Sequence, residues 1–276
     1  GCNLVGVRCD GEGMVPSDLE KALVTCKNLG QRPRVLYTVP TGQNPSGSTA
    51  TDARKEEIYK IACDWDLIVL EDDPYRFLLY GKDPYPTSVE TWTRPPSKSM
   101  FQMDEQGRVI RFDSLSKILS SGLRLGFATG PTELIDRINL HTQASNLHPS
   151  GMSQAVCAKL LQHWGYEGFE QHVTKVALYY MKRRDIFENI ARKYLSSHAE
   201  WTTPSAGMFV WFRLPKVDDT QDLIQNKARD ANVLLLPGQA FSPSNSKSQF
   251  VRAAFSTASA EDMEEAVKRF ARLLES

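Results

Sequence analysis

Residues 114–126 read Ser-Leu-Ser-Lys-Ile-Leu-Ser-Ser-Gly-Leu-Arg-Leu-Gly and place one lysine, Lys117, between two strand-like runs. The runs are Val109–Phe112 before it and Leu125–Ala128 after it. A lysine at the end of a strand, among hydroxyl groups and before Arg124, suits a covalent bond to an aldehyde beside a bound phosphate. The simpler alternative for Lys117 is a solvated surface lysine.

Two more strand-like runs in the first half lead into unusual segments. The pairs are Val35–Val39 with Pro40–Gly47, and Leu67–Leu70 with Glu71–Tyr75. Helix-like segments alternate with the runs, which favours an α/β domain with a mostly parallel sheet. In such sheets ligands bind beyond the carboxyl ends of the strands. We therefore expect Asn44, Asp72 and Lys117 to converge on one rim.

The second half has a different pattern. A long amphipathic stretch from about residue 168 to 194 has the length to bridge two domains. After it come strand-like runs at Met208–Leu214, Val233–Leu236 and Phe250–Phe255, with helices at about 222–231 and 260–274. We expect a large domain over residues 1–167 and a small α+β domain over residues 168–276 that includes the bridging helix. Near the start, Leu4–Val7 indicates a strand and Ser17–Glu20 a helix capping box.

Composition excludes several classes of protein. The 33 basic residues balance the 33 acidic ones, so no net field attracts nucleic acid or an anionic membrane. Apolar runs are far shorter than the roughly 20 residues of a membrane-spanning helix. The five cysteines are odd in number and widely spaced, which indicates reduced thiols inside the cell, and the five histidines lack the spacing of zinc ligands. We expect no nucleic-acid, membrane or metal partner, and a cytoplasmic location.

Together, the segments around Asn44, Asp72 and Lys117 resemble the pyridoxal-phosphate (PLP) enzymes of aminotransferase fold type I. Within that fold they are most similar to the kynurenine/α-aminoadipate and aromatic aminotransferase group, and the likeness runs from Asn3 to about Leu274. It implies a PLP-binding large domain with a mostly parallel sheet, incomplete at its N-terminus, and a smaller α+β C-terminal domain. The family's upstream phosphate loop and ring-stacking residue have no match here. We therefore expect an N-terminally truncated chain that binds cofactor poorly or not at all; a mitochondrial location remains an alternative, because a targeting segment would lie upstream.

The resemblance also implies catalytic roles. Lys117 would form the Schiff base with PLP and then carry the substrate proton, and Asp72 would face the pyridinium nitrogen. Tyr75 and Asn44 would hydrogen-bond the phenolic oxygen of the cofactor. The alternative for Asp72 is a turn residue, and the neighbouring Glu71 and Asp73 are expected to be structural.

Two anion sites are implied as well. Ser114, Ser116 and Arg124 would hold the cofactor phosphate, whereas Arg252, with Asn44, would bind the substrate carboxylate. An arginine inside the apolar run Phe250–Phe255 is unfavourable to bury without an anionic partner. The alternatives are a surface ion pair for Arg124 and a solvent-facing edge position for Arg252.

The implied activity belongs to amino acid metabolism. An aromatic, kynurenine-like or α-aminoadipate donor would pass its amino group to a 2-oxo acid such as 2-oxoglutarate, in a homodimer. Two alternatives stay open: a PLP-sensing domain of a transcription regulator, and another PLP reaction on the same fold.

Overall fold

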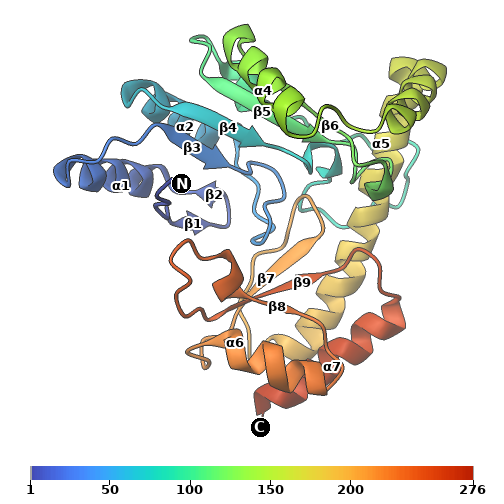
Figure 1. Cartoon of the computed structure of the whole chain (residues 1–276). Helices are drawn as coiled ribbons and strands as arrows, with labels where there is room; N and C mark the ends of the chain where they lie inside the picture. The colour runs from blue at the N-terminus through green and yellow to red at the C-terminus, as the bar shows by residue number, and fades with distance from the viewer. Residues whose placement is uncertain (1, 276) are drawn as a thin grey trace.

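A four-stranded sheet carries the first half of the chain (Figure 1). The computed structural model describes residues 2–275 and orders the strands β3 (Val35–Thr38), β4 (Ile68–Asp72), β5 (Val109–Ser114) and β6 (Gly126–Thr129). β3, β4 and β5 run parallel, and β6 runs antiparallel to β5. The mostly parallel sheet is confirmed. β6 is the exception because the short link between β5 and β6 leaves no room for a crossover helix.

Helices α1 (Pro16–Asn28), α2 (Asp52–Asp64) and α3 (Met100–Met103) bury one face of this sheet. Their apolar side chains form one cluster with the strands: Leu19, Leu23, Leu36, Ile58, Ile61, Ala62, Leu67, Val69, Met100 and Val109. In β3 the alternation is strict, because Leu36 and Thr38 are buried whereas Val35 and Tyr37 are exposed. The exposed face is the one on which Tyr37 and Asp72 meet.

A long helix, α5 (Gly151–Leu195), connects the two halves (Figure 1). It is kinked at Gly165, where φ is 61°. Before it lies α4 (Thr132–Ser145), none of whose residues is buried. The expected boundary between residues 167 and 168 falls within α5, just after the kink, and remains a prediction.

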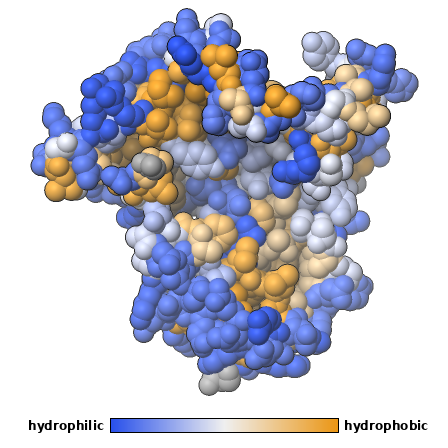
Figure 2. All heavy atoms as spheres, viewed as in Figure 1, coloured by the Kyte–Doolittle hydropathy of each residue, from blue (hydrophilic) through white to orange (hydrophobic). Residues whose placement is uncertain are grey.

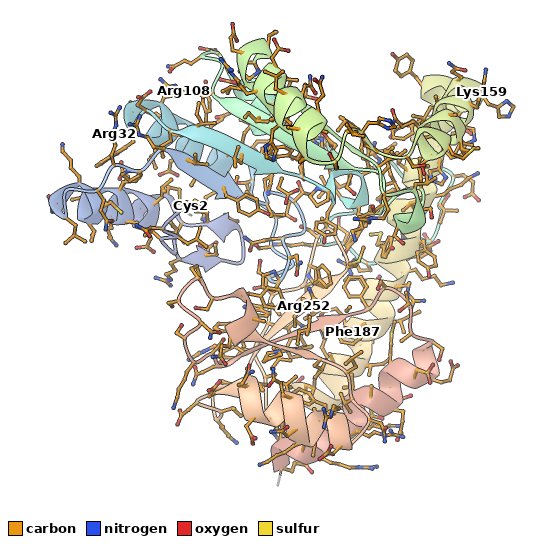
Figure 3. The ribbon with its side chains drawn as sticks, viewed as in Figure 1. Cys2, Arg32, Arg108, Lys159, Phe187 and Arg252 are labelled. Atoms are coloured by element: carbon orange, nitrogen blue, oxygen red, sulfur yellow. The ribbon has the colours of Figure 1, made fainter. Side chains whose placement is uncertain are left out.

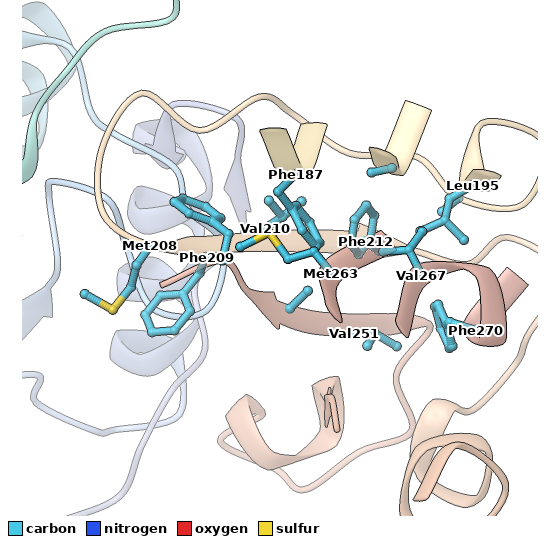
Figure 4. Close-up of a cluster of buried hydrophobic side chains, with 14 of the residues drawn as sticks. Phe187, Leu195, Met208, Phe209, Val210, Phe212, Val251, Met263, Val267 and Phe270 are labelled. Carbon is cyan, nitrogen blue, oxygen red and sulfur yellow. The ribbon is translucent and has the colours of Figure 1, made fainter. Parts of the chain in front are cut away.

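The second half is built on a three-stranded antiparallel sheet. Its order is β7 (Phe209–Arg213), β9 (Phe250–Ala254) and β8 (Leu236–Pro237). α5 and α7 (Ala260–Glu275) cover it, and α6 (Thr220–Asp222) with the π-helical η3 (Leu223–Ala228) lies beside them. Figure 4 shows the resulting core, in which side chains from α5, β7, β9 and α7 interlock: Phe187, Phe212, Val251, Val267 and Phe270.

Several smaller elements differ from expectation. Leu4–Val7 forms no strand; it is mostly exposed, and the first pairing is the short hairpin β1 (Cys9–Asp10) with β2 (Gly13–Met14). Helix α1 begins at Pro16 after Val15, so the capping box at Ser17–Glu20 is wrong. Single-turn helices complete the chain: η1 (Arg76–Leu78), η2 (Ser121–Leu123) and η4 (Gly238–Phe241). Within residues 2–275, no helix has the combined length and apolar character of a membrane span.

Candidate active site

Side chains from four separate segments meet where the two sheets face each other. Lys117 Nζ lies 5.9 Å from the ring centroid of Tyr75, which packs edge-on against Phe209 at 6.0 Å. The guanidinium of Arg252 lies 4.3 Å above the same Phe209 ring, and its Nη1 donates a 2.6 Å hydrogen bond to Asn44 Oδ1. Figure 3 shows Arg252 between the upper and lower sheets, and Figure 2 shows the surface hollowed at this level. Lys117 and Asn44, both expected on this rim, are thus connected through the side chains of Tyr75, Phe209 and Arg252.

Asp72 is the last residue of β4, and its carboxylate lies near the phenol of Tyr75. Burial raises the pKa of the Tyr75 phenol; the positive charge of Arg252 opposes this, and the carboxylate of Asp72 reinforces it. Tyr75 therefore stays a neutral hydrogen-bond donor at neutral pH. Asp72 also contacts Tyr37, whose Oη donates a 2.6 Å hydrogen bond to Asp72 Oδ2.

The loop that carries Asn44 owes its shape to two glycines, one on each side of it. Gly42 has φ +53°, and a Cβ there would lie 2.7 Å from the backbone nitrogen of Gly207. Gly47 has φ +66°, and its Cβ would lie 2.5 Å from the carbonyl oxygen of Phe209. Only residues without a side chain allow this close approach. The packing holds Asn44 against the second sheet, within reach of Arg252.

A buried charge cluster anchors the carboxyl ends of β4 and β5 beside Asp72. Arg111 donates to both oxygens of Asp113 at 2.6 and 2.7 Å and to Asp73 Oδ2 at 3.1 Å, and its Nη1 lies 3.8 Å from Glu71. Two backbone N–H groups at the start of α3 donate to Glu71. Burial raises the pKa of both Glu71 and Asp73, and Arg111 opposes the rise. The structural role expected for these two acids agrees with this geometry.

The three residues expected at a phosphate lie in the stretch from the last residue of β5 to the first residue of β6. Ser114 ends β5, and its Oγ accepts a 3.2 Å hydrogen bond from the backbone of Ser116. Arg124 has a left-handed backbone, is exposed, and donates through Nη1 to the carbonyl of Ser121. Their role at a phosphate remains a prediction.

The donor set of the rim fits an anionic ligand. Within residues 2–275, Lys117, Arg124 and Arg252 form no ion pair with a carboxylate. Three cations of this kind, with the neutral donor Tyr75, match a ligand that carries a phosphate and a carboxylate. The described residues contain no group of three or more His, Cys, Asp or Glu that could hold a metal ion.

Sequence reasoning missed Tyr37 and the aromatic support of Arg252. Phe209 belongs to the strand-like run Met208–Leu214, which predicts no contact with a ligand-binding residue. Its ring lies 4.3 Å from the Arg252 guanidinium, and the ring of Phe241 lies 5.2 Å from the same group. The sequence could have indicated Tyr37 in one way. Alternate residues of a strand face the same side of the sheet, and the strand of Tyr37 ends at the same rim.

Comparisons with known proteins all lead to aminotransferases. Residues 1–270 match the family model of class I and II aminotransferases. The kynurenine/alpha-aminoadipate aminotransferase, mitochondrial, of Bos taurus is 43% identical over 281 residues, which cover 99% of this chain and 63% of the bovine protein. Aminotransferase tdiD of Emericella nidulans is 40% identical and covers 100% of this chain, with 62% of its own length matched. The chain thus spans less than two thirds of these relatives.

The similar solved structures are also aminotransferases. The kynurenine aminotransferase of Pyrococcus horikoshii, solved in complex with PMP, is 30% identical, with a TM-score of 0.86 over 98% of this chain and 63% of that one. The aromatic aminotransferase Aro9 of C. albicans has a TM-score of 0.89 at 28% identity, over 98% of this chain and 63% of its own.

Proposed function

The chain belongs to the class I and II aminotransferase family, and from this membership we propose that the protein transfers an amino group from an amino acid to a 2-oxo acid with PLP as cofactor. The observation that carries the proposal is the line of contacts from Lys117 through Tyr75 and Phe209 to Arg252 and Asn44. Within residues 2–275, neither the lysine nor the arginine at the ends of this line forms an ion pair with a carboxylate. When bound, PLP supplies an aldehyde that accepts the amino group and a ring that withdraws electrons from the substrate Cα.

Lys117 and Asp72 take the two roles that depend on a proton. The Lys117 amine would hold the cofactor aldehyde and, once free of it, would move the proton at the substrate Cα. The Asp72 carboxylate would hold a proton on the ring nitrogen, because a nearby negative charge favours the protonated, cationic form.

Asn44 and Tyr75 bind the phenolic oxygen of the cofactor. Arg252 donates to Asn44 Oδ1, and this fixes the orientation of the amide so that Nδ2 is free to donate to the ligand. The Tyr75 phenol supplies the second donor. Ser114, Ser116 and Arg124 bind the phosphate, with Arg124 as the permanent charge.

Arg252 is well prepared to bind a substrate carboxylate. One of its N–H groups is used on Asn44, and the rings of Phe209 and Phe241 hold the planar guanidinium. The remaining N–H groups can form a two-pronged contact with a carboxylate, which orients the Cα–H bond for proton removal.

Relatives named for kynurenine, α-aminoadipate and aromatic substrates support donors of these types, with 2-oxoglutarate as acceptor. We propose a homodimer, the commonest closed assembly. A cytoplasmic location is proposed, with the mitochondrion as alternative because three relatives are named mitochondrial. We also propose domains over residues 1–167 and 168–276.

The test measures a new amino acid. The protein is incubated with PLP, L-kynurenine, L-α-aminoadipate or an aromatic amino acid, and 2-oxoglutarate, and L-glutamate is quantified. Lys117→Ala should lower the rate by about 10²–10⁴-fold, the usual contribution of a positioned proton carrier. The matched control is Lys159→Ala, since Lys159 is exposed on α5 far from Arg252 (Figure 3). Glutamate formation that survives in Lys117→Ala would refute the assignment.

A further inference from the structure

Asp72 has a partner that the proposed function does not use. Tyr37 lies in β3, opposite Leu70 of β4 in the register, and its side chain stands on the same face of the sheet as that of Asp72. Its Oη donates a 2.6 Å hydrogen bond to Asp72 Oδ2. The bond joins two adjacent strands at the rim where Lys117 and Tyr75 meet.

The bond is of the charge-assisted kind. An O–H···O⁻ distance of 2.6 Å lies in the range of hydrogen bonds to ionised acceptors, which are roughly twice as strong as neutral ones. Partial burial of the phenol and the hydrogen bond to Asp72 both raise the pKa of Tyr37. The phenol therefore keeps its proton at neutral pH and acts toward Asp72 as a donor.

Packing does not account for Tyr37. Its side chain is 58% exposed, and it joins none of the three hydrophobic clusters formed within residues 2–275. A phenylalanine would serve equally well if the ring alone mattered. The polar group at the tip is the part of Tyr37 that makes a specific contact.

We propose that Tyr37 is a positioning residue for the cofactor acid: its hydroxyl orients the Asp72 carboxylate and occupies Oδ2, which leaves Oδ1 for the ring nitrogen. This inference rests on the proposed function. A carboxylate held by one donor cannot rotate freely about its Cβ–Cγ bond, so its free oxygen keeps one direction. With its free oxygen held in that direction, the negative carboxylate can stabilise a protonated ring nitrogen, because a nearby opposite charge favours the cationic form.

The test compares Tyr37→Phe with wild type and with Tyr166→Phe, a control at a tyrosine that is 98% exposed. Two signals are followed at neutral pH: the dissociation constant of PLP, by equilibrium dialysis, and the ¹⁵N resonance of ring-labelled PLP in the loaded protein. In Tyr37→Phe we expect PLP to bind roughly 2–10-fold more weakly, the range of one net hydrogen bond. We also expect the ¹⁵N resonance to move toward the unprotonated position. Turnover should fall through kcat, with KM for the amino acid unchanged, because Tyr37 lies behind Asp72 and not at Arg252.

A second measurement needs no cofactor. The ¹³Cζ resonance of Tyr37 is titrated in the wild type and in Asp72→Asn, in which we expect the phenol to lose its proton at a lower pH. Unchanged PLP affinity and an unchanged ¹⁵N resonance in Tyr37→Phe would overturn this inference alone, as would identical Tyr37 titrations. A wild-type protein that binds no PLP would overturn the proposed function together with the inference.

Discussion

Arg111 holds the end of the central strands together, so its removal should destabilise the fold sharply. The side chain is 7% exposed and bonds to Asp113 and Asp73, and Glu71 lies at 3.8 Å. Arg111→Met keeps much of the apolar stem but removes the positive charge that lies beside all three acids. Glu71 retains two backbone donors, whereas Asp73, which is 2% exposed, loses its cationic partner.

Breaking a buried ion pair by removing one partner costs about 3–5 kcal/mol. We expect Arg111→Met to lose a free energy of unfolding in this range at neutral pH. With a urea m-value of about 3 kcal/mol/M, the unfolding midpoint should fall by roughly 1–1.7 M. Equilibrium unfolding in urea, followed by far-UV circular dichroism, measures this shift.

The loss should depend on pH in a defined direction. Burial raises the pKa of Glu71 and Asp73, and Arg111 limits the rise. A carboxyl whose folded-state pKa is raised lowers stability increasingly as the pH rises through that pKa. Because the rise is larger without Arg111, the deficit of Arg111→Met should be greatest at neutral pH and shrink in acid.

Arg108→Met is the matched control, since Arg108 pairs with the exposed Asp66 at 2.9 Å. Such surface pairs contribute about 0–1 kcal/mol. Adding Asp73→Asn to Arg111→Met should restore part of the lost stability, because one uncompensated charge is gone. The reasoning would be refuted if Arg111→Met lost no more stability than Arg108→Met.

Two further predictions concern the supports of the rim. Gly42→Ala should lose about 1–3 kcal/mol more free energy of unfolding than Gly30→Ala, because the new Cβ meets the Gly207 backbone at 2.7 Å. A Cβ at Gly30 (φ +71°) has nothing within 4 Å, so Gly30→Ala costs only about 1–2 kcal/mol for its left-handed backbone. Urea unfolding of both variants checks this, and equal losses would contradict it. Lys55 is 1% exposed and bonds to Asp52 at 3.2 Å. Burial alone would raise the pKa of Asp52, but a backbone N–H and the Lys55 ammonium more than offset it and hold the pKa below its usual value. Wild-type stability should therefore fall as the pH drops through that lowered pKa, and Lys55→Met should show a smaller fall across the same acid titration; superimposable profiles would count against the pairing.

Much of the site was accessible from local sequence patterns. Apolar runs that end in Asn44, Asp72 and Lys117 predicted three parallel strands and one rim, because the carboxyl ends of such strands share an edge. The expected resemblance to fold type I aminotransferases is confirmed by the match over residues 1–270. Arg252 was also recognised from its unusual place in an apolar strand, and it lies at the rim.

What the sequence did not reveal depends on partners far away in the chain. The Tyr37–Asp72 bond and the contact of Phe209 with Arg252 join residues whose local patterns are those of ordinary strands. Leu4–Val7 has the apolar character of a strand but pairs with no neighbour, and a strand needs a partner for its backbone groups. Ser17 had the spacing of a cap, yet Pro16 suits the first turn and starts the helix earlier.

The most direct test of the account is to find which amine carries the cofactor. The PLP-loaded protein is reduced with borohydride, digested, and mapped by mass spectrometry for the pyridoxyl group. The account predicts the label on Lys117, the lysine 5.9 Å from the Tyr75 ring. A label on any other lysine, with Lys117 unmodified, would contradict it.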